Sequence, residues 1–269
     1  MPGAAAVRFP GRLRATLGNS MTHWQLARLR PGAAFPPPEQ AWPAQSPYPG
    51  LLAIGGAVDS ATLRNAYAQG IFPWFGEDEP PLWWSPDPRM VLLPQDLTVR
   101  RSLRQSARRY AADPRFELRV DSAFEQVMRA CAAPRAGAPG TWIGPLILRA
   151  YGDLHAQGLA HSFELWRDGD LVAGLYLVAL GAAAFGESMF TRVDDGSKVA
   201  LMALCGFAQH HGIRFIDCQQ QTAHLASLGA GPWPRERFLR ELRQARALEG
   251  PACWQYDWTQ FHQHCAAWL

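Results

Sequence analysis

Two polar residues stand in an otherwise apolar segment near residue 216. Asp217 and Gln219 are two positions apart in segment 213–219, which has the composition of a buried strand. Alternate strand residues share a face, so the sequence predicts both side chains on one face, with Ile216 and Cys218 on the other. A carboxylate and an amide placed together could orient an amine and help it lose a proton. The structural alternative is an aspartate that ties down a neighbouring loop.

A third polar side chain that could do chemistry is Glu187. It lies in the word FGESMF, residues 185–190, within a predicted strand. A carboxylate there could bind a cationic substrate group, or it could form a structural salt bridge. Asp194 and Asp195, in the loop that follows, could share the binding role.

Aromatic residues and prolines crowd segment 70–89, GIFPWFGEDEPPLWWSPDPR. No helix survives this density of proline, so the segment is predicted to be mostly irregular. Aromatic side chains on a rigid loop can bind a flat group such as adenosine, or they can fill the core. The five aromatic residues are Phe72, Trp74, Phe75, Trp83 and Trp84.

Basic residues could bind phosphate at two places. Arg100, Arg104 and Arg108 are spaced to share one face of a helix predicted near 98–110. Lys198 lies at the start of another predicted helix, whose N-terminus favours phosphate. The functional interpretation is contact with a nucleic-acid backbone, and the alternative is a solvated surface. The net charge of +3 is by itself a weak indication of nucleic-acid binding.

Composition restricts the class of protein. With 48% hydrophobic and 18% charged residues over 269 positions, the chain is predicted to be globular, with one large or two smaller domains. It has no apolar run of the ~18 residues that a membrane span needs. Five scattered cysteines without a CxxC pair indicate neither a disulfide framework nor a zinc ribbon, and they fit a reducing cytoplasm. No metal site is expected, since the C-terminal run 262–265 lacks a second ligand pair.

The elements expected to position these residues form an α+β (mixed α/β) fold. Strands are predicted at 161–167, 170–180, 183–190 and 213–219, with a helix capped by Ser197 between the last two. We expect residues 1–20 to be a disordered extension and 21–95 a small N-terminal domain that contains the aromatic loop. Residues 96–250 are expected to form the catalytic domain, and residues 251–269 a C-terminal tail.

Several short sequence motifs occur in a characteristic order and spacing. Besides GIFPWF, LWWSPDPR and FGESMF they include GLLAIGGAV (50–58), GTWI (140–143), HSFELWRDGDLVAGLYLVA (161–179), IDCQ (216–219) and HLASLGA (224–230). From about residue 35 to about residue 242 the sequence resembles the bacterial leucyl/phenylalanyl-tRNA–protein transferase family. The resemblance implies transfer of Leu or Phe, with Met as a further candidate donor, from aminoacyl-tRNA to the N-terminal Arg or Lys of a protein. That product is a degradation signal of the N-end rule pathway. The resemblance also implies a catalytic domain similar to the N-acetyltransferase superfamily, with no cofactor, metal or membrane.

The resemblance assigns roles to individual residues. Asp217 and Gln219 fall at the catalytic positions, where the Gln carbonyl receives a hydrogen bond from the attacking amine and the Asp supports it electrostatically. Direct base action by Asp217 is the simpler alternative. Glu187 would contact the acceptor's basic N-terminus. Trp74 and Trp142 would lie beside the terminal adenosine of the tRNA. The donor side chain would enter a pocket lined by Leu175, Met189 and Leu204, although Ala184 is smaller than the residue that the family often carries there.

Three other functions compete with this interpretation. An acyl-CoA-dependent N-acetyltransferase would need a Gly-rich loop for pyrophosphate, whereas loop 191–198 has one glycine and two aspartates, which would repel it. A transferase that adds amino acids from tRNA to cell-wall precursors would share the donor. A non-enzymatic RNA-binding protein would need only the basic and aromatic residues.

Overall fold

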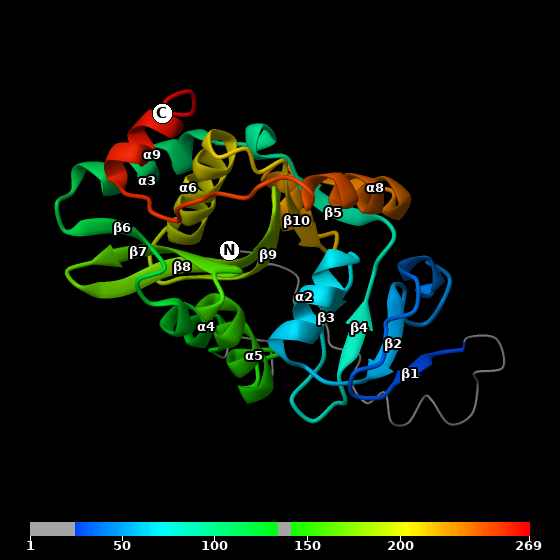
Figure 1. Ribbon diagram of the computed structural model, residues 1–269. Helices are drawn as coiled ribbons and strands as arrows, with labels where there is room; N and C mark the ends of the chain where they lie inside the picture. Colours follow the sequence, from blue (N-terminus) through cyan, green and yellow to red (C-terminus); the bar gives the residue numbers. More distant parts are fainter. Residues whose placement is uncertain (1–24, 134–140) are drawn as a thin grey trace.

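The computed structural model describes residues 25–133 and 141–269, and two sheets form its framework (Figure 1). The expected extension 1–20 and the loop 134–140 lie outside the described residues. The smaller sheet has the order β1-β2-β4-β3. Its strands are β1 (Ala27–Leu29), β2 (Leu51–Gly55), β3 (Phe72–Pro73) and β4 (Leu82–Trp84).

The larger sheet contains seven strands in the order β11-β5-β10-β9-β8-β7-β6. β9 and β10 pair in parallel, and the other neighbours pair antiparallel. The strands are β5 (Arg89–Leu92), β6 (Phe116–Val120), β7 (Ala160–Arg167), β8 (Asp170–Leu180), β9 (Ala183–Thr191), β10 (Phe215–Gln219) and β11 (Gly231–Trp233). The mixed α/β class expected from the sequence is therefore confirmed.

Helices cover both faces of this sheet (Figure 1). On one face α3 (Arg101–Ala112), α6 (Gly196–His210) and α9 (Trp258–His264) enclose one hydrophobic cluster. On the other face α4 (Phe124–Ala132) and α5 (Pro145–Ala156) enclose a second cluster. That cluster also contains the small sheet, α2 (Ser60–Ala68) and α8 (Arg235–Ala245). Shorter helical turns are η1 (Pro38–Gln40), η2 (Pro94–Asp96) and α7 (Ala223–Ser227).

The aromatic segment is built into the small sheet to a greater extent than expected. Phe72, Phe75, Trp83 and Trp84 are each at most 5% exposed, and Trp83 is completely buried. The core-filling interpretation is therefore right for these four residues. Trp74 differs, because it is only half-buried.

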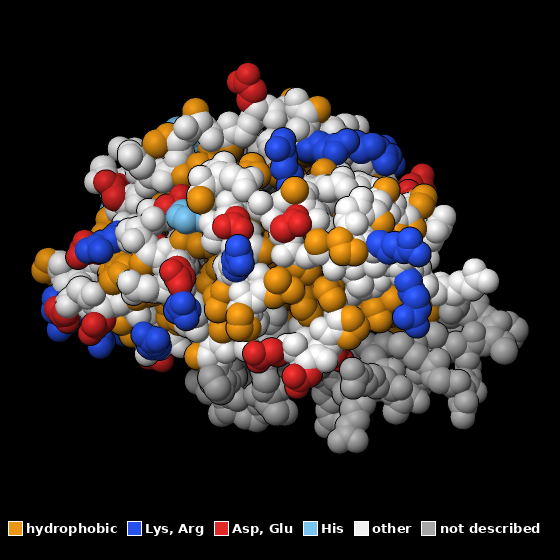
Figure 2. All heavy atoms as spheres, turned by 60° about the horizontal axis from the view of Figure 1, so that its bottom comes forward, with side chains coloured by type: hydrophobic (Ala, Val, Ile, Leu, Met, Phe, Trp, Pro, Cys, Tyr) orange, Lys and Arg blue, Asp and Glu red, His pale blue; other side chains and the backbone are white. Residues whose placement is uncertain are grey.

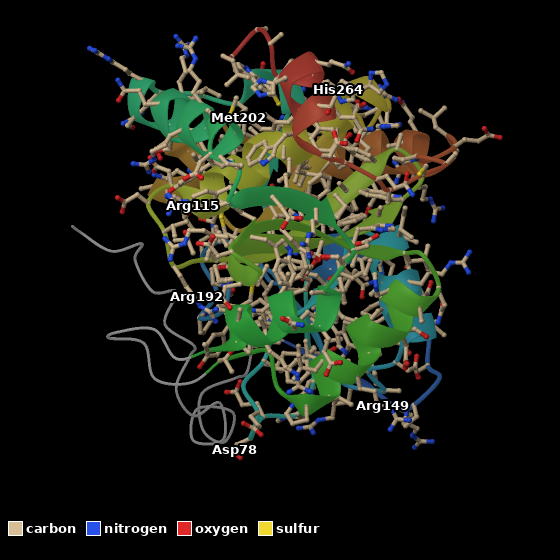
Figure 3. All side chains as sticks on the ribbon, turned by 90° about the vertical axis from the view of Figure 1, so that its left-hand side faces the viewer. Asp78, Arg115, Arg149, Arg192, Met202 and His264 are labelled. Carbon is tan, nitrogen blue, oxygen red and sulfur yellow. The ribbon has the colours of Figure 1, made fainter. Side chains whose placement is uncertain are left out.

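The domain boundary that we expected at residue 95 does not separate the two sheets. β5, at residues 89–92, lies inside the large sheet between β10 and β11. Residues 251–269, expected as a tail, contain α9, whose Phe261 is completely buried. The thiol of Cys265 donates to the Met202 carbonyl of α6 at 3.6 Å, and Figure 3 shows Met202 and His264 near each other. The large sheet and its covering helices thus include residues on both sides of the expected range 96–250.

The surface is mixed in character. Figure 2 shows hydrophobic side chains gathered near the middle of the face that lies at the bottom of Figure 1, with acidic and basic side chains around them. No helix within residues 25–133 and 141–269 is long and apolar enough to cross a membrane.

Candidate active site

Asp217 lies at the centre of the large sheet and forms an ion pair with Arg89. Arg89 Nε donates to Asp217 Oδ1 at 2.8 Å, and Nη2 donates to Oδ2 at 2.7 Å. Both side chains are 0% exposed. A bidentate arginine–carboxylate pair fixes the carboxylate in position as well as compensating its charge. Asp217 is therefore held in a fixed orientation on β10, facing β5.

Gln219 is placed by a bulge that follows Asp217. The register between β10 and β5 shifts between Asp217 and Gln219, and Gln219 has a φ of 62°, in the left-handed region. The backbone N–H of Gln219 donates to Asp217 Oδ1 at 2.8 Å. Ile216 and Cys218 pack with the cluster on the α6 face, so the alternation predicted for this strand is confirmed.

Glu187 accepts hydrogen bonds from three neutral donors. Tyr67 donates to Oε1 at 2.6 Å, Tyr151 donates to Oε2 at 3.1 Å, and Gln219 Nε2 donates to Oε1 at 3.0 Å. The two tyrosine hydroxyl oxygens also lie within hydrogen-bonding distance of each other; because they carry two protons between them, all three contacts are hydrogen bonds at once only when the Glu187 carboxyl is protonated. The residues that the structure describes include no salt bridge to Glu187, so the structural salt bridge considered above is not found among them. Since a carboxylate only accepts, the carbonyl oxygen of the Gln219 amide faces away from Glu187.

The surroundings of Glu187 raise the pKa of its carboxyl above the usual value. Burial raises the pKa of its carboxyl to about 7; the nearby charge of Asp217 also raises it, whereas the hydrogen bonds from the tyrosines and Gln219 lower it. Burial likewise raises the pKa of Tyr67 and Tyr151 well above the usual value, so both remain neutral O–H donors. Glu187 is half-buried, and a cation that reached it would stabilise its ionised form.

Sequence reasoning missed three residues of this network. Arg89 was quoted only as the last letter of LWWSPDPR, yet an arginine at the head of the apolar run MVLL indicates a partner for a buried acid. Tyr67 and Tyr151 lie on α2 and α5, and each falls on the buried face of its helix. No local pattern identifies their common partner, because the three residues meet only through the tertiary fold.

The two tryptophans expected beside adenosine lie on neighbouring loops. Trp142 packs edge-on against Tyr151 with the ring centroids 6.4 Å apart, and Trp74 packs against Trp84 at 5.4 Å. Trp74 and Trp142 are each half-buried. The loops approach each other, since a Cβ added at Gly144 would lie 3.7 Å from the Glu77 side chain. Trp142 is thus linked to Glu187 through Tyr151, whereas Trp74 approaches from the small sheet.

The three residues expected to line the donor pocket lie in the cluster on the α6 face. Leu175 and Met189 are directly paired between β8 and β9, and Leu204 comes from α6. Leu175 is 5% and Leu204 1% exposed, whereas Met189 is half-buried. Tyr67 and Tyr151, which bind Glu187, belong to the cluster on the opposite face. The three residues therefore belong to one cluster, on the face of the sheet opposite that of Tyr67 and Tyr151.

The expected phosphate-binding residues differ in their surroundings. Arg104 and Arg108 are exposed on α3, and Arg100 is the residue before its first turn. In the described part of the chain none of these three forms a salt bridge, although Arg104 Nε donates to the Trp268 carbonyl at 2.7 Å. Lys198 is paired with Asp195 at 2.7 Å.

The start of α6 was misassigned from the sequence. Asp195, rather than Ser197, occupies the capping position, with a φ of 58° and no side-chain cap. Its carboxylate accepts hydrogen bonds from Ser106 of α3 and from Lys198. Tyr110 of α3 donates to the Asp194 carbonyl at 2.6 Å. α3 is therefore tied to the loop that begins α6.

Comparison with known proteins identifies the family. A model described as leucyl/phenylalanyl-tRNA protein transferase matches residues 91–243, and a model of that family's N-terminal domain matches residues 56–87. The chain belongs to the leucyl/phenylalanyl-tRNA protein transferase family. The resemblance read from the sequence words is confirmed, and the protein is an aminoacyltransferase.

Relatives named leucyl/phenylalanyl-tRNA–protein transferase are similar over most of their length. A protein from Albidiferax ferrireducens is 56% identical over 236 residues, which is 86% of this chain and 92% of the relative. One from Polaromonas sp. is 53% identical with the same coverage. One from Cupriavidus metallidurans is also 53% identical, over 85% of this chain and 92% of the relative.

Two solved structures are more distantly similar to this family member. They are L-PGS from Bacillus licheniformis and a GCN5-related N-acetyltransferase from Kribbella flavida. The first has a TM-score of 0.36 at 12% identity and covers 61% of this chain and 52% of that structure. The second has a TM-score of 0.29 at 16% identity and covers 63% and 59%. These scores are too low to carry an argument, and the expected likeness to N-acetyltransferases stays a prediction.

Proposed function

We propose that this protein moves Leu or Phe from Leu-tRNA or Phe-tRNA to the N-terminal Arg or Lys of acceptor proteins. Transfer from aminoacyl-tRNA to protein N-termini is the activity of its family. The cationic N-terminal residue of the acceptor is the more specific part of the proposal, and Glu187 is the residue that supports it. A carboxyl that has only neutral hydrogen-bond donors and a pKa of about 7 gains most from a cationic partner.

The chemical step needs little catalytic assistance from the protein. The aminoacyl ester is already activated, and the α-amine of the acceptor, with a pKa of about 7.7–8, attacks its carbonyl as the free base. The C–N bond forms, the ester C–O bond to the ribose breaks, and the proton lost by the amine ends on the ribose hydroxyl. Positioning and electrostatic stabilisation suffice for such a reaction, and no nucleophilic side chain is needed.

Gln219 is the group that we assign to the attacking amine. Its Nε2 donates to Glu187, which leaves the amide oxygen to accept a hydrogen bond from the amine. An amide oxygen is not a base, so Gln219 orients the amine and stabilises its developing positive charge.

Asp217 supports Gln219 and is less suited to act as the base itself. Both of its oxygens accept from Arg89, Oδ1 also accepts from the Gln219 N–H, and the side chain is 0% exposed. A carboxylate so fully engaged would have to break hydrogen bonds before it could take a proton. The supporting role is therefore the one that we propose.

The remaining assignments extend this proposal to the donor. Trp74 and Trp142 would stack on the terminal adenosine, at about 1–3 kcal/mol per stacked base. Met189, the half-buried member of the pocket set, would meet the donor side chain first, with Leu175 and Leu204 behind it. Arg100, Arg104 and Arg108 would contact the tRNA backbone, and Lys198 could do so if it left Asp195.

We further propose that both parts of the chain serve both substrates, since Tyr67 and Arg89 from residues 21–95 support the acceptor site and Trp142 from residues 96–250 contributes to binding the adenosine. Aminoacyl-tRNA is a cytoplasmic substrate, so we place the reaction in the cytoplasm. The acyl-CoA alternative is disfavoured at the start of α6, where the Asp195 carboxylate would repel a pyrophosphate.

One assay tests the proposed function against its rivals. The protein is incubated with an Arg-initiated peptide and either labelled Phe-tRNA, free Phe with uncharged tRNA, or labelled acetyl-CoA. Transfer from Phe-tRNA alone is expected, with the same peptide carrying an acetylated N-terminus as the inactive control. Labelling from acetyl-CoA would select the acetyltransferase, and binding of tRNA without transfer would select the RNA-binding protein.

A further inference from the structure

Arg89 is a completely buried arginine to which the transfer step described above gives no role. It is the first residue of β5 and is 0% exposed, so it cannot touch either substrate. Burying a guanidinium costs several kcal/mol unless its charge is paired, and a pair of apolar residues would often serve stability as well. The position of this pair, next to the groups assigned to the reaction, points to a use other than stability.

The geometry connects Arg89 to Gln219 through a single carboxylate oxygen. Asp217 Oδ1 accepts from Arg89 Nε and from the Gln219 backbone N–H, each at 2.8 Å. That second hydrogen bond spans the bulge at which Gln219 takes its left-handed backbone conformation. A non-glycine residue holds this conformation only where its surroundings impose it. The fork of Arg89 fixes Asp217, and Asp217 fixes the turn that aims Gln219 at Glu187.

Arg89 is itself held by two aromatic rings from different parts of the chain. Its guanidinium carbon lies 4.7 Å from the ring centroid of Phe72 on β3 and 4.6 Å from that of Phe238 on α8. Among the described residues its Nη1 has no hydrogen-bond partner, so the rings provide the remaining cation–π contact. Phe72 is two residues from Trp74, and the same arginine therefore links the aromatic loop to the catalytic strand.

We propose that Arg89 is a positioning residue of the transfer reaction, which acts through Asp217 to hold Gln219 in its reactive orientation. This rests on the proposed function of Gln219. A lysine at position 89 would keep the charge but lose the planar fork that binds both carboxylate oxygens. Acceptor binding would lose at most the Gln219 hydrogen bond to Glu187, because the two tyrosine donors stay in place, so KM should change less than the rate.

The test is a double-mutant cycle of Arg89→Gln and Asp217→Asn, with Arg89→Lys as the conservative variant. Single-turnover transfer from Phe-tRNA to an Arg-initiated peptide is measured at saturating substrates and normalised to the folded fraction. We expect Arg89→Gln to lower the rate about 10²-fold or more with acceptor KM raised by no more than about 10-fold, and Arg89→Lys to restore part of the loss. In the Asp217→Asn background, Arg89→Gln should cost less than about 3-fold further.

A matched control is Arg115→Gln, which breaks the exposed bidentate pair with Asp113 and should leave the rate within about 2-fold. Figure 3 shows Arg115 near the periphery of the molecule. Equal losses from Arg89→Gln in both backgrounds would overturn the proposal, as would an unchanged rate. If Arg89→Gln does not fold, the cycle is repeated with Arg89→Lys and Asp217→Asn. Equal losses from Arg89→Lys in both backgrounds would then overturn the proposal. Absence of transfer by the wild-type protein would instead refute the proposed function.

Discussion

The side-chain amide of Gln219 donates to Glu187 at 3.0 Å, just beyond the point where β10 and β9 stop pairing. The last paired residues of these parallel strands are Asp217 and Phe185. One short contact thus joins the group assigned to the attacking amine and the group assigned to the acceptor's cation. The acceptor's N-terminus can then be held at both its charged and its reactive atoms.

The acceptor KM should depend on the ionisation of Glu187. Its pKa is about 7, so the carboxyl is neutral below that pH and negatively charged above it. For an Arg-initiated peptide at saturating Phe-tRNA we therefore expect KM to rise as pH falls through about 7, by roughly 10-fold per unit once the carboxyl is protonated. The measurement is the pH dependence of KM, kept separate from that of kcat, which also reports the amine.

Glu187→Gln is the matched control for this pH dependence. It keeps the shape of the side chain but removes the titration, so the variant should show a high KM that varies little between about pH 6 and 8. A wild-type KM that is flat over the same range would contradict the assignment of Glu187 to the acceptor's cation.

Removing either tyrosine hydroxyl should weaken acceptor binding near neutral pH. Tyr67→Phe and Tyr151→Phe each delete one donor to Glu187, and a hydrogen bond to a charged group is worth about 1.5–3 kcal/mol. Because these hydrogen bonds lower the pKa of Glu187, its titration should move to higher pH in both variants. We expect acceptor KM at pH 7 to rise about 10-fold, with little change in donor KM.

Tyr110→Phe provides the control for the tyrosine variants. It also removes a buried hydroxyl, but its partner is the Asp194 carbonyl on the α6 face. Acceptor KM in Tyr110→Phe should equal that of the wild type. An equal rise in KM for all three variants would mean that loss of stability, rather than of the donors to Glu187, is being measured.

Asp217→Asn should slow transfer by about 10²–10³-fold, because Gln219 loses its positioning carboxylate, and it should also destabilise the fold. The substitution leaves the buried Arg89 without a counter-charge, and breaking one side of a buried ion pair costs about 3–5 kcal/mol. For a chain of this size the melting temperature should fall by about 6–20 °C. Thermal melting and single-turnover transfer at a temperature where the variant is folded separate the two effects.

Asp113→Asn is the corresponding substitution in a solvent-accessible pair, since half-buried Asp113 pairs with exposed Arg115. It should change neither melting nor transfer appreciably. Near-normal turnover by the folded Asp217→Asn variant would show that Asp217 has only a structural role.

Replacing Arg100, Arg104 and Arg108 by Ala should weaken tRNA binding and flatten its salt dependence. The slope of log K against log salt should change by about one for each phosphate group that the variant no longer neutralises. Transfer from a minimal aminoacyl-adenosine should survive, because the substituted side chains are on α3, on the opposite face of the sheet from Tyr67 and Tyr151.

A second basic helix provides the comparison. The exposed residues Arg237, Arg240 and Arg243 of α8 lie outside the predicted tRNA-binding face, and their triple Ala variant should keep the wild-type slope. If the α3 variant binds tRNA normally at several salt concentrations, that helix face is solvated surface only.

The sequence predicted what depends on local pattern. The alternation in β10 placed Asp217 and Gln219 on one face, whereas the aromatic segment, predicted to be mostly irregular, contributes β3 and β4 to the small sheet. A helix cap is also a local feature, and Asp59 caps α2 by accepting from the Thr62 N–H at 2.8 Å. Each of these features is decided by residues close together in the chain.

What the sequence could not predict depends on distant pairs. Tyr67 and Tyr151 are 84 residues apart, and their shared acceptor is known only once α2, α5 and β9 are packed together. The expected boundary at residue 95 placed β5 with the N-terminal domain, because nothing in MVLL shows which of two sheets it joins. The bulge before Gln219 was also missed, since it requires no glycine.

The position of β5 has a consequence for how the protein is made. Its neighbours β10 and β11 both follow it at a great distance in sequence, and Arg89 precedes Asp217 by 128 residues. At about 5–20 residues per second, a ribosome needs about 6–26 s to synthesise the intervening chain. During that time β5 has no strand to pair with and the guanidinium of Arg89 has no carboxylate partner. Such long-range pairings form slowly. The candidate active site is therefore among the last parts of the nascent chain to form, because it needs the pairing of Arg89 with Asp217 across 128 residues.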